Sequence, residues 1–306
     1  MARVFMDNLR PRRGPGRLPW LVWAAVFASS AGVVVPSAQI PQQAGDADLE
    51  QTLLRVGRRL EQWYSRAQTV VSEETVWIQP LGADMSPSDV PRRLAFELRV
   101  DWDPSRTSAA GEPEATVLRQ ALGLERGAAR SDHGCVDPKP VSPEPLGILL
   151  PARRGESSFT PGGTAQVNDR RALVIDYRGL GTLPPVIHWS GECVSVALHG
   201  RSRGRIWVDA ETYDVLRLSD RLVGTFELPV PQELVRRGAA PTMIIERAET
   251  TIRYRHVQFE DPREVLTLPD AVDTVAIWRG TAVRRYRISQ RLSRHRRYLT
   301  DARLLY

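Results

Sequence analysis

Three carboxylates lie close together in the stretch GRIWVDAETYDVLRLS, residues 204–219: Asp209, Glu211 and Asp214. Neighbouring carboxylates can serve as general acid and base when their surroundings move their pKa values apart. The flanking apolar runs favour a different interpretation, because they alternate with polar residues as strands do. We predict that the chain reverses at Ala210–Thr212, with Asp209 capping the turn and Glu211 at its exposed tip. The stretch is therefore interpreted as a hairpin, and no catalytic residue is predicted.

A second group of reactive side chains lies in HWSGECVSVALHG, where His188, Cys193 and His199 are the weak candidates for metal ligands. Thiolates and imidazoles bind zinc, but the segment lacks CxxC, HxxxH and HExxH spacing. We therefore predict no metal site and no cofactor. The chain has two cysteines, Cys135 and Cys193. An even count in an exported chain suggests a disulfide, but their spacing does not show whether they are close enough to pair, so both states remain open.

A third candidate is the basic run RRYRISQRLSRHRR, residues 284–297. Period-two alternation places Tyr286, Ile288 and Leu292 on one face and arginines on the other, which is typical of a strand with one solvated face. Contact with acidic lipid head groups is the alternative. The chain has no Walker loop, no GxGxxG after a strand and no GxSxG elbow. We therefore do not predict an enzyme.

The first 38 residues predict export. Five arginines precede the apolar run LVWAAVFASSAGVVV at residues 21–35, and small residues follow it, as in a secretory signal peptide. Cleavage is expected after Ala38, although a retained inner-membrane anchor is the alternative. Without residues 1–38 the formal charge falls from +6 to +2, which gives no support to a nucleic-acid partner. We expect the protein in the bacterial periplasm or outside the cell, touching the membrane only through a retained N-terminal segment.

The rest of the chain predicts one helix followed by many strands. Residues 39–45 are expected to be flexible, and apolar residues every three or four positions predict an amphipathic helix over 46–67. In RLAFELRVDW, residues 93–102, strict alternation predicts a half-buried antiparallel strand. Comparable strands are predicted at 70–78, 172–177, 205–209, 213–222, 244–259 and 283–292.

Three irregular features interrupt this pattern. Residues 103–145 form a Pro/Gly-rich insertion within a single domain, 46–306, and residues 114–126 inside it are expected to be helical. PLGILLP, residues 145–151, predicts a short buried turn of helix. The apolar phase shifts by an odd step between Tyr254 and Val257, which indicates a β-bulge.

The motifs PLGILLP, GRIWVDAETYDVLRL, FEDPREVLTLP and HRRYLTDARL resemble those of a group of uncharacterised bacterial secreted proteins near the lipoprotein-carrier superfamily. That superfamily includes the periplasmic lipoprotein carrier, the outer-membrane lipoprotein receptor and sigma-factor regulators. The resemblance covers residues 46–306. It implies an α+β fold: a strongly curved antiparallel sheet, an open half-barrel plugged by one or more helices, whose concave face can hold acyl chains.

The predicted function is that of a non-enzymatic exported protein that binds a lipid, a lipoprotein acyl chain or another apolar ligand. Phe96, Leu98 and Trp102 share one strand face and are the candidates to line the site. One alternative is an envelope interaction or signalling module with a fully packed core, bound to other cell-envelope proteins through its arginine-bearing face. The other is an extracytoplasmic hydrolase, which requires polar groups that converge in a cleft.

Overall fold

The computed structural model describes residues 42–67, 70–107, 113–122, 144–181, 184–190, 193–198, 200–261, 263–280 and 283–297. The predicted signal peptide and Cys135 lie outside these ranges. No helix in the described part of the chain is both long and apolar enough to cross a membrane.

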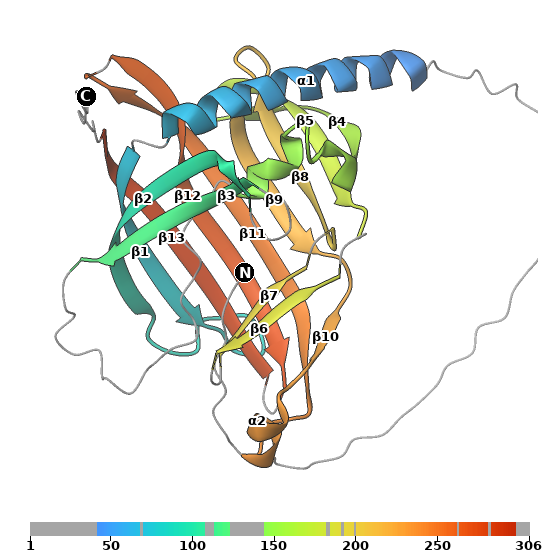
Figure 1. Ribbon diagram of the computed structural model, residues 1–306, viewed down its shortest axis with the longest axis vertical. Helices are drawn as coiled ribbons and strands as arrows, with labels where there is room; N and C mark the ends of the chain where they lie inside the picture. The colour runs from blue at the N-terminus through green and yellow to red at the C-terminus, as the bar shows by residue number, and fades with distance from the viewer. Residues whose placement is uncertain are drawn as a thin grey trace, which may run out of the picture.

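The described chain forms two α-helices, two short 3₁₀ helices and thirteen strands (Figure 1). The helical elements are α1 (Gln42–Ala67), η1 (Glu144–Leu149), η2 (Arg154–Glu156) and α2 (Gln232–Arg236). The strands are β1 (Val70–Pro80), β2 (Arg92–Thr107), β3 (Pro113–Ala121), β4 (Ser157–Val167), β5 (Arg170–Gly179), β6 (Val186–Ser190), β7 (Cys193–Ala197), β8 (Ser202–Asp209), β9 (Val215–Leu222), β10 (Phe226–Pro229), β11 (Thr242–Phe259), β12 (Glu264–Arg279) and β13 (Val283–Arg297).

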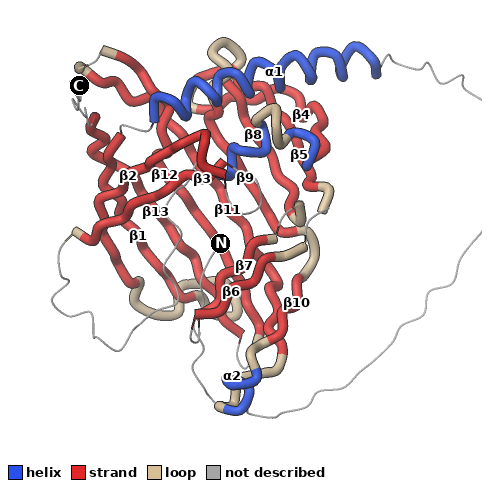
Figure 2. Tube along the Cα trace, in the orientation of Figure 1, coloured by secondary structure: helices blue, strands red, loops and turns tan. Residues whose placement is uncertain are grey.

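Eleven of the described strands form one open antiparallel sheet in the order β3-β2-β1-β13-β12-β11-β9-β8-β5-β4, with β10 paired to β11. Strands β6 and β7 form a separate hairpin. Several pairings contain register shifts, including two between β11 and β12. Such bulges bend a sheet and increase its twist. Figure 2 shows the long strands running side by side beneath α1, so the predicted curved α+β sheet with a helix across it is confirmed.

The inner face of the sheet is covered at two places. Near one end, α1 and η1 pack on apolar residues of β5, β8, β9, β11 and β12, among them Ile206, Leu218 and Ile252. Near the other end, the β6–β7 hairpin and α2 pack on β10, β11 and β12. We call the side of the sheet that these elements cover the inner face. Successive side chains of a strand point to opposite sides, so the remaining alternate residues of each strand form the outer face.

Most predicted elements are confirmed, with small changes at their ends. The helix begins at Gln42 rather than residue 46. PLGILLP forms η1, whose Leu146 and Leu149 are buried. The bulge predicted between residues 254 and 257 is not found there, because the pairing with β12 is unbroken from Tyr254 to Phe259. The nearest register shift lies between Arg253 and Tyr254, where the extra residue is Asp270 on β12.

The helix predicted at residues 114–126 is wrong, because Pro113–Ala121 is strand β3. It pairs with β2 along the sheet edge, from Phe96 opposite Ala121 to Trp102 opposite Ala115. Helix propensity is a weak signal, and backbone pairing to an open edge strand overrides it in a short segment.

Candidate ligand-binding site

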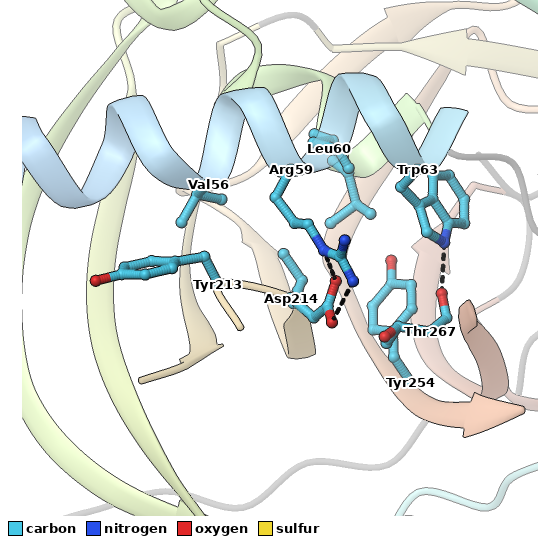
Figure 3. A pocket seen from close by; sticks show the side chains of 10 residues that line it. Val56, Arg59, Leu60, Trp63, Tyr213, Asp214, Tyr254 and Thr267 are labelled. Carbon is cyan, nitrogen blue, oxygen red and sulfur yellow. Dashed lines mark hydrogen bonds and ion pairs between the residues drawn. The ribbon is translucent and has the colours of Figure 1, made fainter. Parts of the chain in front are cut away.

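A small cavity of about 20 Å³ lies between α1 and the inner face (Figure 3). Helix α1 contributes Val56, Arg59, Leu60 and Trp63 to its walls. The other lining residues come from η1, the β8–β9 turn, β9, β11 and β12: Leu146, Tyr213, Asp214, Val215, Tyr254 and Thr267. The cavity is mostly apolar, and its volume matches about one water molecule.

The polar side of this cavity is an ion pair between helix and sheet. Arg59 Nε donates to Asp214 Oδ1 at 2.7 Å, and Arg59 Nη2 donates to Asp214 Oδ2 at 3.1 Å. We call this bidentate pair the α1 latch. The hydrogen bond to Asp214 raises the pKa of Arg59, against the opposing effect of burial. His256 Nε2 lies 3.7 Å from Asp214 Oδ2, so a second basic side chain borders the same carboxylate.

Two more contacts hold α1 beside the latch. Trp63 Nε1 donates to the Thr267 backbone oxygen at 2.5 Å, which fixes the indole against β12. Arg55 Nη1 donates to the Tyr213 hydroxyl at 2.5 Å, and the same guanidinium lies 5.2 Å from the Tyr213 ring centroid. Tyr254 lies fully buried beneath the helix, and burial raises its pKa. The helix is therefore attached by apolar packing and by these three polar contacts. Arg154 Nη2 and Arg297 Nη1 also donate to backbone oxygens of the helix, those of Leu53 and Arg66.

The three acids of residues 204–219, Asp209, Glu211 and Asp214, have separate roles, and they do not converge on one site as a catalytic pair would. Asp209 Oδ1 accepts hydrogen bonds from the backbone N–H groups of Glu211 and Thr212, both at 2.9 Å, as predicted for the cap of a turn. Burial pushes the pKa of Asp209 up, but hydrogen bonds from Arg170 and these N–H groups outweigh it, so the pKa lies below its usual value. Glu211 is exposed. Asp214 is buried and belongs to the α1 latch, which sequence reasoning missed because Arg59 is 155 residues away.

The predicted lining residues lie on β2, outside the cavity beneath α1. Leu98 is buried in the same apolar cluster as the inner side of α1. Phe96 is half-buried and packs near Val76 and Ile288, with the guanidinium of Arg119 4.0 Å from its ring centroid. The side chain of Trp102 lies outside the described residues. Sequence reasoning therefore missed the α1 residues that line the cavity, although their helical spacing was visible.

Of the three weak metal candidates, only His188 has a described side chain. His188 is exposed on β6. His199 and the side chain of Cys193 lie outside the described residues, as does Cys135, so the disulfide stays a prediction. Among the residues that the structure describes, no group of three His, Cys, Asp or Glu side chains could hold a metal ion.

Comparison with known proteins was made at the level of sequence and of structure. The chain matches no protein-family model, and no curated protein matches its sequence. Among solved structures it is similar to an outer membrane lipoprotein-sorting protein domain from Vibrio parahaemolyticus, with 8% identity, 81% of this chain and 94% of that chain covered, and a TM-score of 0.36. It is also similar to a DUF1329 family protein from Desulfovibrio piger, with 12% identity, 84% of this chain and 94% of that chain covered, and a TM-score of 0.39. A LolA superfamily protein from Nitrosomonas europaea is similar with 8% identity, 83% of this chain and 97% of that chain covered, and a TM-score of 0.34.

Identities and TM-scores this low carry no argument about function, so the site must be interpreted from its own residues.

Polar groups are also buried on the inner face away from α1. Glu74 on β1 is 1% exposed and accepts hydrogen bonds from Arg119 Nε at 2.7 Å and Gln290 Nε2 at 2.6 Å. Its neighbour Glu73 points to the other face and pairs with Arg294, so the two glutamates cannot act as a catalytic pair. This buried network joins β3, β1 and β13 and places a charged pair on the inner face.

Two further buried pairs bear on the hydrolase alternative. The Tyr177 hydroxyl donates to Asp220 Oδ1 at 2.6 Å, and burial raises the pKa of both groups. Ser72 Oγ lies 2.8 Å from His295 Nδ1, but Ser72 is only 6% exposed. Burial, with the nearby Arg255 charge, lowers the pKa of His295 to about 4. A nucleophile needs access to its substrate, so this pair is better explained as a buried contact that joins β1 to β13.

Proposed function

We propose that this chain is an exported, non-enzymatic binding protein that takes up an apolar chain, such as the acyl chain of a lipid or lipoprotein, between α1 and the inner face of the sheet. The observation that carries the proposal is the apolar cavity bordered by Val56, Leu60 and Trp63 beneath an amphipathic helix. The helix is fastened along one side by the α1 latch, so moving it exposes an apolar surface continuous with the main core cluster.

The size of the cavity decides how binding must occur. Pockets that bind small molecules typically enclose about 300–1,000 Å³, whereas the cavity beneath α1 measures about 20 Å³. An acyl chain therefore enters only if α1 moves away from the sheet. Such a movement separates Arg59 from Asp214 and exposes apolar residues of α1, which the bound chain then covers. In this proposal the α1 latch sets the balance between the closed and open positions of the helix.

The test is titration of delipidated protein with a fluorescent fatty acid. The wild type should show saturable uptake, and Asp214→Asn should take up the probe faster because the latch loses its charge. Asp176→Asn is the matched control: Asp176 also forms a bidentate pair, with Arg205 at 2.6 and 3.0 Å, but on the outer face. Absence of saturable uptake by both the wild type and Asp214→Asn would exclude the proposal.

Native mass spectrometry gives an independent readout. A co-purified mass of lipid size that is lost on delipidation is the expected result. The same spectrum reports whether Cys135 and Cys193 pair, through a two-dalton loss, and whether the mature chain begins after Ala38. A retained N-terminal segment would contradict cleavage of the signal and leave the binding proposal intact.

A further inference from the structure

The outer face of the sheet carries a second site, a hollow of about 740 Å³ open to solvent. It spans β4, β5, β8, β9 and β11, five neighbouring strands that Figure 1 shows below α1. Most lining residues belong to the outward-pointing set, and four of them are arginines: Arg178, Arg203, Arg205 and Arg221. The hollow is therefore a polar, basic concavity on the side of the sheet opposite α1.

The acids that line this hollow all have partners within the protein, and the partners of Asp176 and Asp220 line the hollow as well. Glu249 lies directly opposite Arg221 on the neighbouring strand β11. Asp176 forms the bidentate pair with Arg205. Glu249 accepts a hydrogen bond from Arg247 Nη2 at 2.7 Å. Asp220 belongs to the inward-pointing set and accepts from Tyr177. Within the described part of the chain, no ion pair joins a carboxylate to Arg178, Arg203 or Arg221.

These three arginines form a row across three adjacent strands. Arg178 on β5 lies directly opposite Arg203 on β8, and Arg203 lies directly opposite Arg221 on β9. All three are exposed. Like charges directly opposite on neighbouring strands are destabilising, so two successive like-charged pairs are costly for the sheet alone. An anion bound over the row would remove that repulsion.

We propose that Arg178, Arg203 and Arg221 bind a ligand with two or more phosphate groups. Guanidinium groups match phosphate oxygens in geometry and charge. Strands about 4.7–4.9 Å apart place the outer two arginines about 9–10 Å from each other, wider than a single phosphate can bridge. The three arginines also lie in a concavity rather than on a flat surface, so an anion bound over them can contact more than one guanidinium. The site lies on the opposite face from the apolar cavity and does not depend on acyl-chain binding.

The experiment is calorimetric titration of the full mature chain with tripolyphosphate at physiological salt. Arg203→Gln removes the central charge of the row and should weaken binding by about tenfold or more, the loss expected for a hydrogen bond to a charged group. Arg287→Gln is the matched control, since Arg287 is also exposed on the outer face but lies on β13, outside the hollow. A second readout is the melting temperature without ligand, which Arg203→Gln should leave equal or raise.

Two arms distinguish the source of the phosphate groups. Vesicles of phosphatidylcholine with cardiolipin, whose head group carries two phosphates, test a lipid head group, and tripolyphosphate tests a soluble anion. Arg203→Gln must weaken whichever binds. Equal losses in Arg203→Gln and Arg287→Gln would show an unspecific effect of charge and overturn the site. So would a wild type that binds neither probe. Failure of fatty-acid uptake alone leaves this site standing.

Discussion

Replacing Arg59 with Ala should lower the free energy of unfolding by more than the same replacement in an exposed ion pair does. The side chain of Asp214 is 5% exposed and that of Arg59 32%, so the replacement leaves a buried carboxylate without its bidentate partner. Hydrogen bonds to charged groups contribute about 1.5–3 kcal/mol. For a domain of this size, such a loss lowers the melting temperature by about 3–12 °C.

The assay is a double-mutant cycle of Arg59→Ala, Asp214→Ala and the combined variant, each unfolded with urea and followed by circular dichroism. The coupling energy should be about 1.5–3 kcal/mol. The Arg205–Asp176 pair has the same bidentate geometry with side chains 48% and 35% exposed, and should give about 0.2–1 kcal/mol. Equal coupling energies in the two cycles would refute the argument that burial makes the α1 latch the stronger contact.

Three further predictions concern other parts of the sheet. Glu74→Gln should cost about 3–5 kcal/mol because it leaves a buried arginine without its carboxylate, while Glu73→Gln on the adjacent, solvent-facing position should cost less than about 0.5 kcal/mol in the same urea assay. The lowered pKa of His295, about 4 against 6.5, means that its contribution to stability is complete above about pH 6.5 and is lost as the pH falls toward 4; His295→Gln should flatten the measured stability over that range, and an unchanged profile would contradict it. Gly204→Ala should destabilise by about 3 kcal/mol or more, since the added methyl group overlaps a neighbouring carbonyl oxygen and a tyrosine ring, whereas Gly155→Ala, where nothing lies within 4 Å, should melt like the wild type.

Seven of the thirteen described strands could be predicted from sequence because their apolar alternation is local, whereas β4, β6, β7, β10 and β12 were not predicted. The run at residues 93–102 lies within strand β2, where Leu98 is buried on the inner face. Strand β3 could not be predicted, since its short sequence carries no strong alternation and its state is decided by pairing with β2. Local patterns therefore predicted strands whose own sequence alternates between apolar and polar residues. They did not predict strands whose structure is decided by pairing with a neighbour.

The candidate sites depended on contacts between residues far apart in the chain. Asp214 could be placed at a turn from its neighbours, but its pairing with Arg59 on α1 depends on the fold. Similarly, the arginine row is set by the register of β5, β8 and β9, because Arg178, Arg203 and Arg221 come from three separate stretches. Sequence alternation predicted which residues face outward but not which ones lie opposite each other.

The most direct test of the central claim is cross-linking with a photoreactive fatty acid, followed by peptide mass spectrometry. The account predicts labelled residues on the cavity side of α1, around Val56, Leu60 and Trp63, and on the facing strands around Val215 and Tyr254. Excess unlabelled fatty acid should abolish the labelling. Labelling confined to the outer face, or labelling that excess fatty acid does not reduce, would contradict binding between α1 and the sheet.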